Sequence, residues 1–119
     1  MSPEDHRQPI LNLLSGYERR YPEESARIKR YRQFVIDHPD CFERSLETGH
    51  VTGSALVLDG ARQRVLLTHH RKLNRWLQPG GHADGDSDVL RVAMREAQEE
   101  TGLALIRPVT QALLDVDIH

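Results

Sequence analysis

The stretch that most constrains this chain runs from Gln78 to Leu103 and reads QPGGHADGDSDVLRVAMREAQEETGL. It begins with a glycine pair, passes through three aspartates and ends in an acidic segment followed by Gly102. The pattern predicts a helix from Asp86 or Ser87 to Thr101, because glycine commonly occupies the position just after the last helical turn. The chain is therefore expected to run from a glycine turn into an acidic helix.

Three carboxylates lie on one side of this predicted helix. Glu96, Glu99 and Glu100 are separated by three and four residues, so they are neighbours on the helix surface. Like charges at this spacing repel unless a cation lies among them, and carboxylate oxygens suit Mg²⁺ or Mn²⁺. Taken alone, however, the three glutamates are better explained as a solvated acidic face.

The residues around the glutamates add to the cation hypothesis. Gly80 and Gly81 allow the backbone to approach a metal ion or a phosphate closely. Arg95 is suited to orienting a carboxylate or a phosphate. Apolar positions on the same helix predict that it packs on a sheet while its acids border an open cleft; they are Leu90, Ala93, Met94 and Ala97.

The full spacing resembles the signature box of the Nudix hydrolases. From Gly81 the chain has five residues, Ser87, seven residues and then REAQEETGL, which ends at Leu103. The family pattern is Gly, five residues, Glu, seven residues, then Arg-Glu-apolar-any-Glu-Glu-any-Gly-apolar. Every fixed letter except the first glutamate is matched. The hairpin expected before the box and the segment WLQPGG that leads into it also resemble the family. The resemblance therefore covers about half of the chain.

The resemblance implies an α/β fold, an α/β/α sandwich around a mixed sheet, and hydrolysis of a nucleoside-linked diphosphate with Mg²⁺ or, as the alternative, Mn²⁺. By position, Glu96, Glu99 and Glu100 correspond to the metal-binding and catalytic glutamates of the family. The Gly80 carbonyl corresponds to a further metal ligand, and Arg95 to the arginine that holds the glutamates. The glutamate that activates water varies among members, so no single base is assigned.

Ser87 departs from the family pattern, which has a glutamate that orients the box arginine. Ser87 could serve as the N-cap of the helix, or Asp86 or Asp88 could meet Arg95 instead. The departure predicts a metal-binding box that is held less rigidly. Gly81 is the second residue of the glycine pair, and His82 follows it. Both are candidate substrate contacts.

Residues 1–47 are expected to form a helical segment that precedes a Nudix-like domain of residues 48–119. Two amphipathic faces indicate two helices, with the second starting near Pro22 and ending at His38-Pro39-Asp40. The apolar positions are Ile10, Leu11, Leu13, Leu14 and Tyr17, then Ile28, Tyr31, Phe34 and Val35. The segment suits a cap or a dimerisation element, so a homodimer is left open.

The period changes after Gly49. Two apolar runs, Val51–Leu58 and Arg64–His70, flank Asp59-Gly60 and predict an antiparallel hairpin. A short strand is expected around Trp76-Leu77 and one more after Pro108. Since the family's sheet needs further strands, the chain is expected to end before the sheet is complete, with an open strand edge. Trp76 is expected in the core or the cleft wall.

Composition narrows the expected partners. A net charge of −2 argues against bulk binding of nucleic acid, and a mean hydropathy of −0.59 against a membrane protein. The single cysteine, Cys41, excludes an internal disulfide and fits a reducing cytoplasm, with a buried thiol. A cytoplasmic protein with a small-molecule nucleotide substrate is therefore expected.

Two functions remain open. The first is a Nudix-type pyrophosphohydrolase acting on an ADP-ribose-like compound or a nucleoside triphosphate. The alternative is a degenerate Nudix-like module that binds a nucleotide or a protein without turnover, suggested by Ser87 and by the chain end at His119. A calcium loop at Asp84–Asp88 is set aside because Val89 and Arg95 stand where glycine and glutamate are required.

Overall fold

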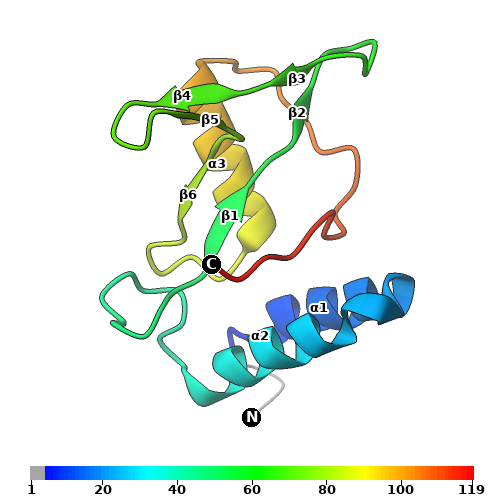
Figure 1. Ribbon diagram of the computed structural model, residues 1–119, viewed down its shortest axis with the longest axis vertical. Coiled ribbons are helices and arrows are strands. Elements are labelled where there is room, and N and C mark those ends of the chain that lie inside the picture. Colours follow the sequence, from blue (N-terminus) through cyan, green and yellow to red (C-terminus); the bar gives the residue numbers. More distant parts are fainter. Residues whose placement is uncertain (1–4) are drawn as a thin grey trace.

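The computed structural model describes residues 5–119, which form an α/β structure with helices at the N-terminus (Figure 1). The helices are α1 (Gln8–Arg20), a 3₁₀ turn η1 (Pro22–Glu24), α2 (Ser25–Asp37) and α3 (Val89–Thr101). The strands are β1 (Thr52–Ser54), β2 (Val57–Leu58), β3 (Val65–Leu66), β4 (Thr68–His70), β5 (Arg75–Leu77) and β6 (Gly80–His82). The expected fold class with N-terminal helices is thus confirmed.

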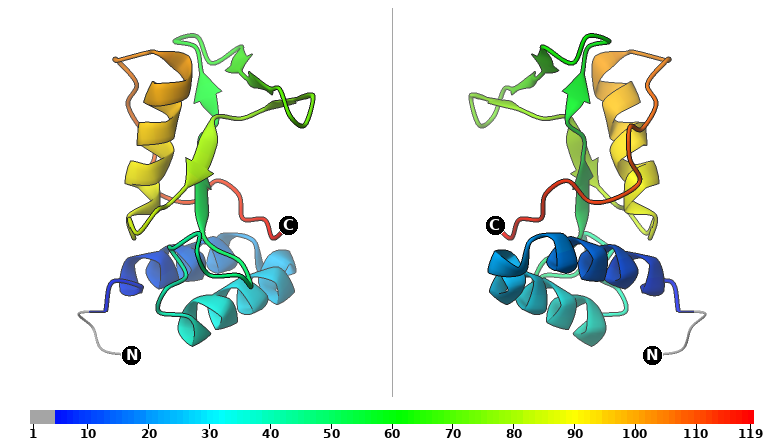
Figure 2. Two further views of the ribbon diagram at one scale, coloured as in Figure 1. Left: turned by 90° about the vertical axis from the view of Figure 1, so that its left-hand side faces the viewer. Right: turned by 90° about the vertical axis from the view of Figure 1, so that its right-hand side faces the viewer.

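The first two helices pack side by side below the strands (Figures 1 and 2). The predicted apolar face of α1 is buried, with Leu13 only half-buried. The predicted start at Pro22 is the 3₁₀ turn, and α2 follows from Ser25. It ends at Asp37, before the proline that prevents the preceding residue from staying helical.

The strands of residues 5–119 form three two-stranded antiparallel sheets: β1 with β6, β2 with β3, and β4 with β5. The predicted Asp59-Gly60 hairpin is confirmed between β2 and β3, where the Asp59 carboxylate accepts hydrogen bonds from the Gln63 and Arg64 amides at 2.9 and 3.2 Å. The predicted long strands are divided, however. β1 pairs with β6 and β4 pairs with β5, so only the end of each run next to Asp59-Gly60 forms the hairpin.

The strand predicted after Pro108 is wrong, because residues 102–119 form no strand. This segment returns to the N-terminal helices, where Arg20 donates to the Leu113 carbonyl at 2.8 Å and Arg27 to the Val116 carbonyl at 3.0 Å. Val116 is buried there. Guanidinium groups, rather than a neighbouring strand, thus bind these two carbonyls.

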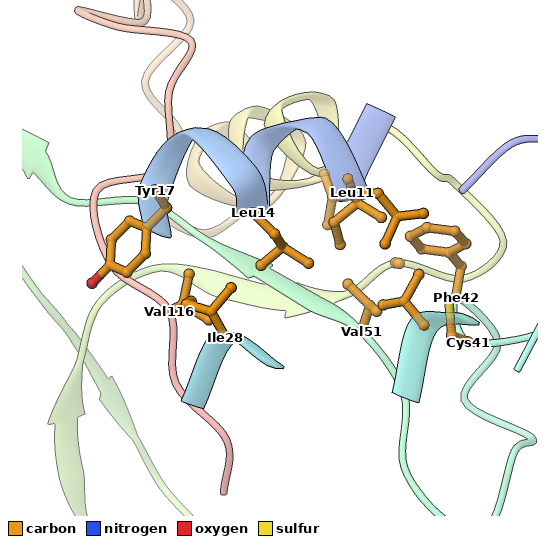
Figure 3. Packing of buried hydrophobic residues seen from close by; sticks show 12 residues of the cluster. Leu11, Leu14, Tyr17, Ile28, Cys41, Phe42, Val51 and Val116 are labelled. Carbon is orange, nitrogen blue, oxygen red and sulfur yellow. The ribbon is translucent and has the colours of Figure 1, made fainter. Parts of the chain in front are cut away.

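One buried cluster joins the helices to the rest of the chain (Figure 3). Tyr17, Leu14 and Ile28 from the helices meet Val116 and Val51. Cys41 belongs to the same cluster and is fully buried, as predicted. Desolvation raises the pKa of its thiol to about 11, so it is predominantly protonated and unreactive at neutral pH.

α3 packs against β1 and β6. Val92 and Ala97 are its buried residues, whereas the predicted Leu90, Ala93 and Met94 are half-buried. The helix ends as predicted at Thr101, with Gly102 in the left-handed conformation at φ 72°. Among residues 5–119, no helix combines the length and the apolar character that crossing a bilayer requires.

Candidate active site

The helix of the box begins later than expected, at Val89. Its N-cap is Asp88, whose side chain accepts a hydrogen bond from the Arg91 amide at 3.1 Å. Ser87 is therefore not the cap. It lines a surface hollow together with Pro9 and Leu13 of α1, so this side chain borders the N-terminal helices.

The pairing of β1 with β6 places the glycine pair directly beside the acidic helix. The register matches Gly53 with Gly81 and Ser54 with Gly80. A Cβ atom added to Gly81 would lie 2.6 Å from the Glu96 carboxyl carbon and 2.7 Å from one of its oxygens. The Glu96 carboxylate thus contacts the Gly81 backbone, and only glycine leaves room for this contact.

Arg95 connects the glycine turn with this carboxylate. Its guanidinium donates to the His82 carbonyl at 3.1 Å and lies 3.7 Å from Glu96 Oε1. It also lies 3.9 Å from Asp86 Oδ2, which is a charge contact rather than a hydrogen bond. Asp86, not Ser87 or Asp88, is therefore the acidic group from the loop that meets the box arginine.

Asp86 is itself held by a second arginine. Arg91 donates to its two oxygens at 2.7 and 2.8 Å, and the Asp88 amide donates at 2.9 Å. The Arg91 hydrogen bonds lower the pKa of Asp86 to about 2, against a smaller desolvation effect. Asp86 is thus an anion at neutral pH and holds the loop before α3 in place.

The neighbouring residues of this loop are attached to the segment after α2. Arg44 donates to both oxygens of Asp84 at 2.8 and 2.7 Å, which lowers the pKa of that carboxyl. The Gly85 amide donates to the Phe42 carbonyl at 2.9 Å. Residues 42–44 therefore hold the loop of the box that precedes α3, although they lie outside the box itself.

His82 is not brought together with Glu96. Side chains alternate along a strand, and since Gly81 faces α3, the His82 side chain lies on the other face of β6. There its Nδ1 lies 2.8 Å from Nε2 of His50, with the two rings 4.9 Å apart. The backbone carbonyl of His82, rather than its ring, contacts the box.

Glu99 and Glu100 lie on the same helix as Glu96 and are exposed. Within residues 5–119, no three side chains of the types that bind metals lie close enough together to hold an ion. The donor chemistry nevertheless fits a hard divalent cation, since one carboxylate already lies at the glycine turn and two more follow within a helical turn. Binding of a cation would have to order the exposed side chains of Glu99 and Glu100.

Sequence reasoning missed three residues of this region: His50, Arg44 and Arg91. His50 and Arg44 reach the box only through tertiary contacts, so no local pattern marks them. Arg91 could have been found, because it lies five residues after Asp86 and near the expected start of the helix. Asp86 was one of the two alternatives considered for Arg95, and Asp88 serves as the cap instead.

The fold and the box define the class of protein. The NUDIX domain family matches residues 49–116, more than half of the chain, and the chain belongs to this family. The match begins close to the boundary at which the helical segment was expected to end.

Individual relatives are similar over the same region. The chain is 39% identical over 66 residues to the m7GpppN-mRNA hydrolase NUDT17 of Danio rerio, covering 51% of this chain and 22% of the relative. The human NUDT17 is 34% identical over 68 residues, covering 53% and 21%. The Xenopus laevis nucleoside diphosphate-linked moiety X motif 6 is 36% identical over 53 residues, covering 44% and 24%. The matched region thus spans about a fifth of the length of these relatives.

We predict that Gly81→Ala and Gly80→Ala have different effects. At Gly81 the added methyl meets only the flexible end of Glu96, so the fold tolerates it while the carboxylate is displaced. A loss in kcat/KM of about 10–100-fold is expected, with little change in melting temperature. At Gly80 the methyl would lie 2.9 Å from Ser54 Cα and 3.0 Å from the Gly53 carbonyl oxygen, so the backbone must shift.

For Gly80→Ala we therefore expect a loss in the free energy of unfolding of about 1–3 kcal/mol. Thermal denaturation and steady-state kinetics of both variants test the two predictions. Equal melting temperatures for the two variants would show that the contacts at Gly80 do not constrain β1.

Proposed function

We propose that this chain carries the catalytic centre of a divalent-cation-dependent hydrolase that cleaves a diphosphate bond in a nucleoside diphosphate derivative. Membership of the NUDIX family supports the reaction class. The observation that carries the proposal to particular residues is the contact of the Glu96 carboxylate with the Gly81 backbone inside the box.

In this proposal Glu96, Glu99, Glu100 and the Gly80 carbonyl hold Mg²⁺ or Mn²⁺. When bound, the cation would neutralise the charge of the phosphate that water attacks. Arg95 orients Glu96 and anchors the His82 carbonyl, and Asp86 adds the negative charge that the family's box glutamate would supply. A glutamate of the box positions or deprotonates the attacking water, which contributes about 10²–10⁴-fold in such reactions.

The candidate substrates are ADP-ribose-like compounds and nucleoside triphosphates. The name of the NUDT17 relatives adds the 5′ cap of mRNA, in which a triphosphate joins two nucleosides. All three contain a diphosphate linked to a nucleoside, so the same centre would serve each of them.

The test is hydrolysis of ADP-ribose, a nucleoside triphosphate and a capped oligoribonucleotide, each with Mg²⁺ and with Mn²⁺. The Glu99→Gln/Glu100→Gln double variant is the control for contaminating activity. Turnover of one substrate by the chain and not by the double variant is expected. Metal binding without turnover of any substrate would refute the hydrolase and favour a binding module.

A further inference from the structure

The hairpin formed by β4 and β5, residues Thr68–Leu77, lies outside the box and projects from the side of the body opposite α3 (Figure 2). Every residue from His69 to Leu77 is exposed. The hairpin contains three basic side chains and no acidic one, so its formal charge is +3 in a chain of net charge −2. This local charge is hidden in the total composition.

Trp76 is not in the core or a cleft wall, as its sequence context suggested, but 67% exposed on this hairpin. It is paired across the strands with His69, whose ring lies 5.0 Å from it. His69 is held in turn by Asn74, at 3.1 Å from its Nε2. One side of the indole therefore rests on a fixed partner, while most of its surface faces solvent.

The three basic residues of the hairpin lie at different positions relative to the Trp76 indole. Arg75 adjoins Trp76 in β5, so its side chain lies on the opposite face of the hairpin. Arg71 and Lys72 lie in the turn, beyond the ends of the strands, and both are exposed. The Leu73 amide donates to Nδ1 of His70 at 3.2 Å and helps to order this turn.

We propose that this hairpin binds a single-stranded polynucleotide, with a base stacked on Trp76 and phosphates bound by Arg71 and Lys72. Exposed aromatic rings and exposed cations on one surface are the combination by which proteins bind unpaired nucleotides without sequence preference, and this hairpin carries both. Sites for free small molecules are concave and enclose most of the ligand, whereas this platform is open. An open site favours a polynucleotide, which gains affinity from several contacts.

The hairpin is also close to the box along the chain. Gly81 is five positions after Trp76, so their Cα atoms lie within about 18 Å of each other. A polynucleotide on the hairpin would thus have one end within reach of the glycine turn. Only this link to hydrolysis rests on the proposed function; binding to the hairpin does not.

The fluorescence of Trp76 provides the test, because it is the only tryptophan of the chain. In this test the full chain is to be titrated with a short single-stranded oligoribonucleotide and, separately, with the corresponding mononucleotide. Both titrations contain EDTA and no divalent cations. Saturable quenching by the oligoribonucleotide is expected, with a slope of log affinity against log salt of roughly −1.4 for two phosphate contacts. The mononucleotide should quench far more weakly.

Variants assign the binding to the hairpin. Arg71→Gln/Lys72→Gln should abolish most of the salt dependence, whereas Arg75→Gln, on the opposite face, should change it little. Lys29→Gln/Arg30→Gln on α2 makes the same total charge change elsewhere and should bind as the parent does. Because Trp76→Ala removes the fluorophore, its affinity is measured by anisotropy of a labelled oligoribonucleotide and should fall by roughly 5–100-fold.

Matched apolar and aromatic variants complete the set. Leu73→Ala, at another exposed apolar position of the hairpin, should bind normally, and Trp76→Phe should retain part of the affinity. The proposal is overturned by absence of quenching, by equal affinity for the mononucleotide, or by equal losses in the hairpin and α2 double variants. Hydrolysis assays are run separately, so failure of catalysis and failure of binding are distinguished.

Discussion

Replacing Glu96 by glutamine is expected to lower kcat by about 10²–10⁴-fold, the contribution of a positioned carboxylate to proton transfer. Glutamine keeps the shape of the side chain against Gly81 but removes the charge that the proposed cation and Arg95 require. The melting temperature should remain close to that of the parent, because Glu96 is half-buried at the edge of the α3 packing rather than in the core. Activity should therefore be lost without loss of fold.

The measurement is steady-state hydrolysis at saturating Mg²⁺, together with thermal denaturation of the same preparation. Glu47→Gln is the matched control, since Glu47 is an exposed glutamate far along the chain from the box and its replacement makes the same change in charge. If Glu96→Gln kept more than half of the parental kcat, Glu96 would not be a catalytic or metal-binding group.

The second large effect is expected in the core. Ile28→Ala should lower the free energy of unfolding by about 2–5 kcal/mol, because it leaves a cavity in a packed interior. Ile28 is fully buried and belongs to the cluster that joins α1 and α2 to Val51 and Val116 (Figure 3). Its removal should therefore loosen both the N-terminal helices and the returning C-terminal segment.

Ile36→Ala is the matched control, because Ile36 lies on the same helix but is 45% exposed. Its replacement should lower the free energy of unfolding clearly less, since nearly half of its surface already contacts water and a smaller cavity is left. Denaturant unfolding monitored by far-ultraviolet circular dichroism measures both. Equal losses for the two variants would mean that α2 does not pack through Ile28 as described.

Much of the candidate site was predictable from the sequence because its determinants are local. The spacing of Glu96, Glu99 and Glu100 places them on one side of a helix wherever that helix packs. Gly102 ends the helix because glycine adopts the left-handed conformation at little cost in free energy. The two N-terminal helices were predictable for the same reason, from apolar residues repeated at helical spacing.

The pairing of the strands was not predictable in the same way. Val51–Leu58 has the composition of one strand, yet β1 pairs with β6 and only β2 belongs to the Asp59 hairpin. Apolar runs show that residues favour extended structure but do not select the partner, which depends on contacts distant in sequence. The segment after Pro108 likewise has strand-like residues, but Arg20 and Arg27 bond its carbonyls instead.

The sequence by itself determined the family resemblance, the acidic helix with its three glutamates, and the buried faces of α1 and α2, since each depends on spacing within one segment. Only the tertiary structure decided that Gly81 contacts Glu96, that Asp86 rather than Ser87 meets Arg95, and that Trp76 is exposed. These depend on which distant segments share an edge or a face. The free energies that select one pairing over another arise from the packed whole and are not encoded in any single stretch.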